Sequence, residues 1–114
     1  MNIIVVGCSA YMGSGNGCPG EWRCLTAAAK KDEAFKDYAD PKIVGFVRCE
    51  CPGRATVTNV ELVLKQVEGD KIHLSKCLYK ANPPCPYFKP EELAAALKNK
   101  TGLDVVMGTH DYPL

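Results

Sequence analysis

The chain has 114 residues, a length that suits one domain able to bury a core without disulfide staples. Hydrophobic residues make up 46% and charged residues 24%, as in ordinary globular domains, and no apolar run is long enough to span a membrane. The formal charge of +1 excludes a strong net attraction to nucleic acid or anionic lipid. We therefore expect a single domain over residues 1–114 whose partners include neither nucleic acid nor a membrane.

The amino-terminal segment reads as a buried strand. Residues 2–6 (NIIVV) are nearly all apolar and β-branched, a pattern typical of a central parallel strand, and the run stops at Gly7 and Cys8. The opening MNIIVVGC has no charged region before its apolar residues and is too short for a secretory signal. We expect the strand to stay in the mature protein, which favours a cytoplasmic location.

Strand and helix patterns then alternate along the chain. A glycine-rich loop, SAYMGSGNGCPGE, precedes an expected helix in EWRCLTAAAKKDEAFKDY. Apolar runs in KIVGFVRC, KIHLSKC and LDVVMGTH are further expected strands, separated by a helix opening at Cys51-Pro52-Gly53 and by a helix in EELAAALKNK that closes at Thr101-Gly102. This alternation predicts an α/β fold: a single-domain three-layer sandwich with a parallel sheet of about four strands, flavodoxin-like or Rossmann-like.

Cysteine usage is the unusual feature of the composition. Seven cysteines in 114 residues are several times ordinary usage, although below the density of disulfide scaffolds. An odd number in a chain expected to be cytoplasmic argues against a complete set of disulfides. Metal binding or thiol chemistry is the expected use.

The cysteines occur at equivalent points of the strand and helix units. The first three expected strands stop at Cys8, Cys49 and Cys77, and the fourth stops at His110. Because the carboxyl ends of parallel strands share one edge of a sheet, these four side chains are expected to be neighbours. A buried cysteine after a strand usually packs in the core. Core packing alone, however, does not explain why all four expected strands end at a cysteine or a histidine.

A second set of cysteines precedes prolines near expected helix starts. Cys18, Cys51 and Cys85 each come directly before a proline, where the helix dipole and free N–H groups favour a thiolate. Thiolates with imidazole suit zinc, or alternatively iron or an iron–sulfur cluster. The candidate metal ligands are therefore Cys8, Cys18, Cys49, Cys51, Cys77, Cys85 and His110.

Two other residues capable of binding metal have ordinary explanations. Cys24 lies six residues past Cys18 within the expected helix, where core packing is the better interpretation. His73 lies mid-strand between Ile72 and Leu74, as a buried, hydrogen-bonded histidine would. The glycine-rich loop matches neither a phosphate-binding loop nor a dinucleotide fingerprint, so we expect no nucleotide cofactor.

Together these motifs resemble the CGGC domain family, small prokaryotic proteins named for a central Cys-Gly-Gly-Cys. The matching stretches are IVGFVRCECPGR, KIHLSKCLYKANPPCPYF and VVMGTH, with Cys8 in its expected place, so the resemblance spans nearly the whole chain. It implies metal binding, with zinc the expected ion, and supplies no reaction. Carried over, the central cysteines fall on Cys49 and Cys51, and the others on Cys77, Cys85 and His110. This sequence departs from the family by having Glu50 alone between the central cysteines, which alters the spacing of the two sulfurs.

Two other functions remain open from the sequence. A thiol or redox enzyme would use a helix-start cysteine such as Cys51 as its nucleophile, with Arg54 stabilising the thiolate or binding an anion. A binding module would sense or carry metal for a partner. Sequence does not decide whether the protein is an enzyme, which metal it binds, which protein it contacts or how it oligomerises.

Overall fold

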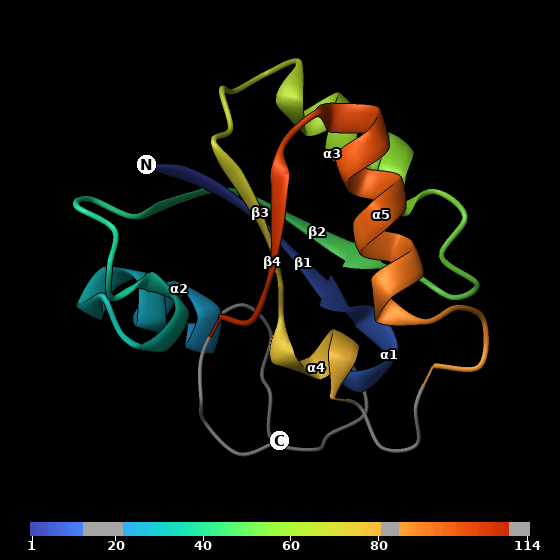
Figure 1. Ribbon diagram of the computed structural model, residues 1–114. Coiled ribbons are helices and arrows are strands. Elements are labelled where there is room, and N and C mark those ends of the chain that lie inside the picture. The colour runs from blue at the N-terminus through green and yellow to red at the C-terminus, as the bar shows by residue number, and fades with distance from the viewer. Residues whose placement is uncertain (13–21, 81–84, 110–114) are drawn as a thin grey trace.

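The computed structural model describes residues 1–12, 22–80 and 85–109. Its centre is a four-stranded parallel sheet in the order β2-β1-β3-β4 (Figure 1). The predicted α/β sandwich with about four parallel strands is confirmed. The strands are β1 (Asn2–Cys8), β2 (Lys42–Cys49), β3 (Lys71–Leu74) and β4 (Asp104–Met107).

Helices cover both faces of the sheet, as Figure 1 shows. α3 and α5 lie on one face, α2 and the 3-10 helix η1 lie on the other, and the short helices α1 and α4 follow β1 and β3. No described helix is long and apolar enough to cross a membrane. The helices are α1 (Ser9–Met12), α2 (Trp22–Lys30), η1 (Glu33–Phe35), α3 (Thr56–Leu64), α4 (Lys76–Tyr79) and α5 (Pro90–Thr101).

The apolar alternation of β1 supplies both cores. Ile4 and Val6 belong to the core beneath α3 and α5, whereas Ile3 and Val5 belong to the core beneath α2. All four side chains are 0% exposed, which explains why the sequence of this strand is apolar on both faces.

The first long helix is shorter than predicted. α2 ends at Lys30, and Lys31 follows with a positive φ of 57°, a left-handed conformation that stops a helix. η1 then turns the chain back so that Phe35, which is 0% exposed, packs in the core beneath α2. The second half of the predicted helix is instead a turn that buries an aromatic ring.

β3 and the helices after the Cys-Pro motifs also differ from the prediction. β3 ends at Leu74, and the Ser75 N–H then bonds to the Val6 carbonyl at 2.9 Å, so that Cys77 lies in α4 and not at the end of a strand. The left-handed Gly53, with φ 85°, keeps the preceding turn out of α3. α3 and α5 each begin five residues after their Cys-Pro cysteine, so the prediction that Cys51 and Cys85 lie at helix starts is wrong.

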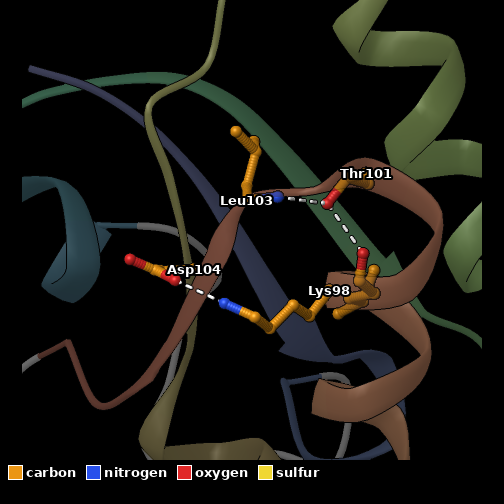
Figure 2. Close-up of polar contacts among 5 residues, drawn as sticks. Lys98, Thr101, Leu103 and Asp104 are labelled. Carbon is orange, nitrogen blue, oxygen red and sulfur yellow. Dashed lines mark hydrogen bonds and ion pairs between the residues drawn. The ribbon is translucent and has the colours of Figure 1, made fainter.

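The connection from α5 to β4 follows the sequence prediction closely. Gly102 caps α5 with φ 75°, and its N–H donates to the Lys98 carbonyl at 2.8 Å. Figure 2 shows the Leu103 N–H bonded to the Thr101 hydroxyl, and Lys98 paired with Asp104 at 2.6 Å. These contacts direct the chain straight from the helix into the edge strand.

Candidate functional site

Cys8 and Cys49 face each other across neighbouring strands. They are register partners at the last position of β1 and β2, so both side chains project from the same face of the sheet. Cys49 is part of the core beneath α3 and α5, and Cys8 packs against that core. The predicted meeting of these two cysteines at the carboxyl edge is confirmed.

Cys77 reaches the same edge from α4. Its sulfur accepts the backbone N–H of Cys8 at 3.3 Å and lies 2.8 Å from the Ser75 hydroxyl oxygen. Cys77 is 3% exposed and Ser75 is 1% exposed. The contact spans the ends of β1 and β3, where the strand order reverses, and α/β sheets of this order bind their ligands at that point.

The electrostatics of Cys49 show that four sulfurs share one environment. Burial raises the pKa of the Cys49 thiol, the Thr56 hydroxyl lowers it, and negative charge on Cys8, Cys85 and Cys51 raises it again. Each of those three thiolates is therefore close enough to Cys49 to oppose its ionisation. Negative charge on these three neighbours disfavours the Cys49 thiolate, and a cation bound beside it would favour that thiolate.

The hydroxyl of Thr56 is buried without a hydrogen-bond partner among the described residues. It acts on the Cys49 thiol, yet its oxygen is buried and makes no hydrogen bond of full geometry with any described residue. Thr56 itself is 1% exposed. A buried hydroxyl in this state is rare in native proteins and calls for a functional explanation.

Cys49 and Cys51 differ in their surroundings although one residue separates them. Cys49 is buried, whereas Cys51 is exposed in the turn before α3. Glu50 between them accepts a hydrogen bond from the Ser9 hydroxyl at 2.7 Å. This bond ties the segment after β1 to the segment after β2, so the Glu50 carboxylate is engaged in holding the two cysteine-bearing turns together.

Gly53 closes the turn tightly over Cys49. A Cβ on Gly53 would lie 3.0 Å from the Cys49 sulfur and 2.8 Å from a ring carbon of Phe88. Phe88 follows the half-buried Cys85 on the way into α5 and packs against the same core. The turn, Cys49 and the segment entering α5 are therefore in direct contact.

Comparison with known proteins now identifies the family. The profile of the CGGC domain matches residues 2–110, nearly the whole chain. The chain belongs to the CGGC family. A relative, an uncharacterized protein of Methanocaldococcus jannaschii, is 31% identical over 114 residues, a match that covers 96% of this chain and 87% of the relative. No solved structure matches the chain.

In this CGGC domain five of the six described cysteines lie near the carboxyl edge, but the described residues do not form a complete metal site. Cys8, Cys49, Cys51, Cys77 and Cys85 all lie at the carboxyl edge or in the segments next to it. Across residues 1–12, 22–80 and 85–109, no group of three or more His, Cys, Asp or Glu side chains is arranged to hold an ion. Two predicted ligands, Cys18 and His110, lie outside the described residues.

The two residues with ordinary explanations behave as expected. Cys24 is 4% exposed on the opposite face of the sheet, with its sulfur 3.3 Å from the Thr109 hydroxyl. His73 is 0% exposed, and its two ring nitrogens pair with the Tyr38 hydroxyl at 2.8 Å and the Gly108 carbonyl at 2.7 Å. Both are core residues of the CGGC fold, as predicted.

Sequence reasoning missed the hydroxyl residues of the site. Ser75 stands two residues before Cys77, and a small polar residue between an apolar strand and a cysteine was the available signal. Thr56 lies seven residues after Cys49 within an expected helix, and its spacing gives no indication of the contact. The turn at Gly53, which lies against the Cys49 sulfur, separates Cys49 from the start of α3 at Thr56.

Proposed function

We propose that this CGGC domain binds a transition-metal ion, zinc, at the carboxyl edge of its sheet. The observation that carries the proposal is the surroundings of Cys49, whose thiol pKa is raised by burial and by repulsion from negative charge on Cys8, Cys85 and Cys51. A divalent cation relieves this repulsion, and thiolate is the ligand type that zinc prefers in structural sites. The candidate ligands are Cys8, Cys49, Cys51, Cys77 and Cys85, together with Cys18 and His110.

The chemistry of the donors fits zinc better than hard cations. Calcium and magnesium require oxygen ligands, whereas the convergent side chains here carry sulfur. The nearest carboxylate, on Glu50, already accepts the Ser9 hydroxyl. When bound, the ion would join the segments that follow the strands.

The six described cysteines are free thiols. Binding requires these thiols to lose their protons, so zinc affinity should fall as pH falls. Zinc would bind the folded chain, in which Cys8, Cys49 and Cys77 meet at one edge of the sheet, more tightly than the unfolded chain. We therefore expect metal to stabilise the fold.

The test is metal analysis of protein purified without oxygen, followed by competition with a chromophoric chelator. The proposal predicts about one equivalent of zinc, lost on replacing Cys49 or Cys8 by serine. Cys24→Ser is the matched control, because Cys24 is a buried thiol on the opposite face. A brown protein with broad visible absorption would assign an iron–sulfur cluster instead. Protein that holds no transition metal and gains none on reconstitution would overturn metal binding.

A further inference from the structure

Cys8 and Cys49 are placed as a disulfide-forming pair requires. They are register partners at the last positions of the neighbouring strands β1 and β2, with their side chains on the same face of the sheet. Neighbouring strands lie about 4.7–4.9 Å apart, and a disulfide joins residues whose Cα atoms are about 4.4–6.8 Å apart. The backbone separation therefore allows a bond between these two sulfurs, both of which are free thiols in the structure.

The residues that follow this pair keep the two strand ends together. Ser9 comes directly after Cys8 and Glu50 directly after Cys49, and the Ser9 hydroxyl donates to the Glu50 carboxylate at 2.7 Å. The ladder of paired backbone residues ends at the cysteines themselves. The two cysteines therefore lie between a backbone ladder on one side and a side-chain hydrogen bond on the other, which holds them at the separation of paired strands.

The two cysteines differ in their access to solvent. Cys8 is half-buried, whereas Cys49 is 6% exposed. A dissolved oxidant therefore reaches the Cys8 sulfur first, and Cys49 is the neighbour that can react with the oxidised sulfur. Cys77 also lies beside Cys8, but its sulfur accepts the Cys8 N–H at 3.3 Å and lies 2.8 Å from the buried Ser75 hydroxyl. A disulfide from Cys77 to Cys8 would disturb both contacts.

We propose that Cys8 and Cys49 form a redox pair that a hydroperoxide converts to a disulfide. In the first step the Cys8 sulfur attacks a peroxide oxygen, the O–O bond breaks, and the thiol proton goes to the leaving oxygen. The sulfur is oxidised to a sulfenic acid, and the hydroperoxide is reduced to an alcohol, or to water in the case of hydrogen peroxide. In the second step the Cys49 sulfur attacks the Cys8 sulfur, the S–S bond forms, and the S–O bond breaks. The hydroxyl group leaves as water with the proton of the Cys49 thiol.

This redox pair would act as a switch on the proposed metal site, and this part of the inference rests on the proposed function. Cys8 and Cys49 are two of the candidate ligands. The sulfurs of a disulfide no longer carry the negative charge with which thiolates bind zinc. Oxidation of the pair would therefore release the ion, and reduction of the disulfide by a thiol would restore binding.

The first test is oxidation of metal-free protein with hydrogen peroxide, followed by alkylation of the remaining thiols and peptide mapping without reduction. Cleavage after Tyr11 separates Cys8 from Cys18, and cleavage after Glu50 isolates Cys49 from Cys51, so the map identifies the linked pair. The proposal predicts a single disulfide, between Cys8 and Cys49. A dominant linkage between any other two cysteines, or no linkage, would overturn it.

Variants provide a matched comparison for this map. Cys49→Ser should lose the disulfide of Cys8, because the resolving sulfur is absent. Cys24→Ser is the control and should retain that disulfide, because Cys24 belongs to the core on the opposite face. The map of the parent protein decides the proposal even if Cys49→Ser fails to fold.

A second test separates the redox pair from the proposed function. In zinc-loaded protein, hydrogen peroxide should release about one equivalent of zinc to a chromophoric chelator as the disulfide forms, and dithiothreitol should restore binding. If the disulfide forms in a protein that binds no zinc, the redox pair stands and the proposed function fails. Zinc that stays bound after the disulfide has formed would overturn the switch.

Discussion

The backbone N–H of Cys8 donates to the sulfur of Cys77 at 3.3 Å, which joins the ends of two neighbouring parallel strands through a side chain. The bond crosses the point where the strand order reverses between β1 and β3. Cys77 therefore has a structural role, and the Ser75 hydroxyl beside it, 1% exposed, depends on the same sulfur. One cysteine thus serves both the fold and the candidate site.

Replacing Cys77 by alanine should lower the free energy of unfolding by about 1–3 kcal/mol, because it removes the acceptor of a part-buried N–H and a neighbour of a buried hydroxyl. Cys77→Ser retains a polar acceptor and should lose less stability, while it should weaken zinc binding as much as alanine does. Urea unfolding and chelator competition measure the two effects. In metal-free protein, Cys51→Ala, at an exposed position, is the control for stability and should stay within about 0.5 kcal/mol of the parent. Equal stability losses at Cys77 and Cys51 would contradict this structural role.

The convergence of Cys8 and Cys49 could be predicted because it depends only on parallel topology. Two apolar runs that each stop at a cysteine bring those cysteines to one edge once the strands pair in register. Cys77 reaches that edge by a different route, since Ser75 bonds to the Val6 carbonyl and the chain enters α4. That bond is a tertiary contact, which no local pattern in KIHLSKC reveals.

The helix boundaries near the site were unpredictable for the same reason. Cys51-Pro52 has the composition of a helix start, but Gly53 adopts a left-handed conformation and α3 begins at Thr56. The choice between turn and helix depends on how Gly53 packs against Cys49 and Phe88. The same packing holds the turn against the Cys49 sulfur, so the turn that the local pattern did not predict is part of the candidate site.

Stability should depend on pH through His73. Burial lowers the pKa of His73 below its ordinary value of 6.5, with the Gly108 carbonyl acting in the opposite direction and Lys71 adding to the decrease. A carbonyl only accepts, so the neutral ring donates from Nδ1 to Gly108 and accepts the Tyr38 hydroxyl at Nε2. Below about pH 6.5 this histidine is protonated in the unfolded chain but stays neutral in the native state. The free energy of unfolding therefore decreases as pH falls toward the native pKa.

Urea unfolding across this range, on the parent and on His73→Asn, measures the contribution of this one ring. The difference in unfolding free energy between the two proteins should be greatest above about pH 6.5 and should shrink as pH falls. Tyr38→Phe keeps the titrating ring and should keep a dependence on pH. A difference between parent and His73→Asn that stays constant with pH would show that His73 does not titrate differently in the two states.

The ion pair of Lys98 with Asp104 allows a prediction about the pKa of the Asp104 carboxylate. The hydrogen bond from Lys98, its positive charge and the charge of Lys71 all lower the pKa of Asp104. Lys98→Met should therefore raise that pKa more than Lys71→Met does, in a carbon-detected NMR titration. Because the native pKa is depressed, the contribution of this carboxylate to stability is present above its unfolded pKa and is lost on acidification. A larger shift in the Lys71 variant would contradict the contact in Figure 2.

Two left-handed glycines allow the packing over Cys49 to be measured. Gly53 and Gly102 have similar φ values, 85° and 75°, so alanine meets a similar backbone cost at both. A Cβ at Gly102 meets nothing within 4 Å, whereas a Cβ at Gly53 meets Phe88 at 2.8 Å and the Cys49 sulfur at 3.0 Å. Gly53→Ala should therefore cost about 1–3 kcal/mol more unfolding free energy than Gly102→Ala, as overpacking does.

The same glycine pair also reports on the site. Gly53→Ala displaces its neighbours, and one of those neighbours is the Cys49 sulfur, so zinc binding should weaken in this variant and not in Gly102→Ala. Urea unfolding measures the first effect and chelator competition the second. If both alanine variants lose the same stability and keep the same zinc affinity, the turn at Gly53 does not hold Cys49. If Gly53→Ala weakens both, the turn supports the fold and the sulfur through one contact.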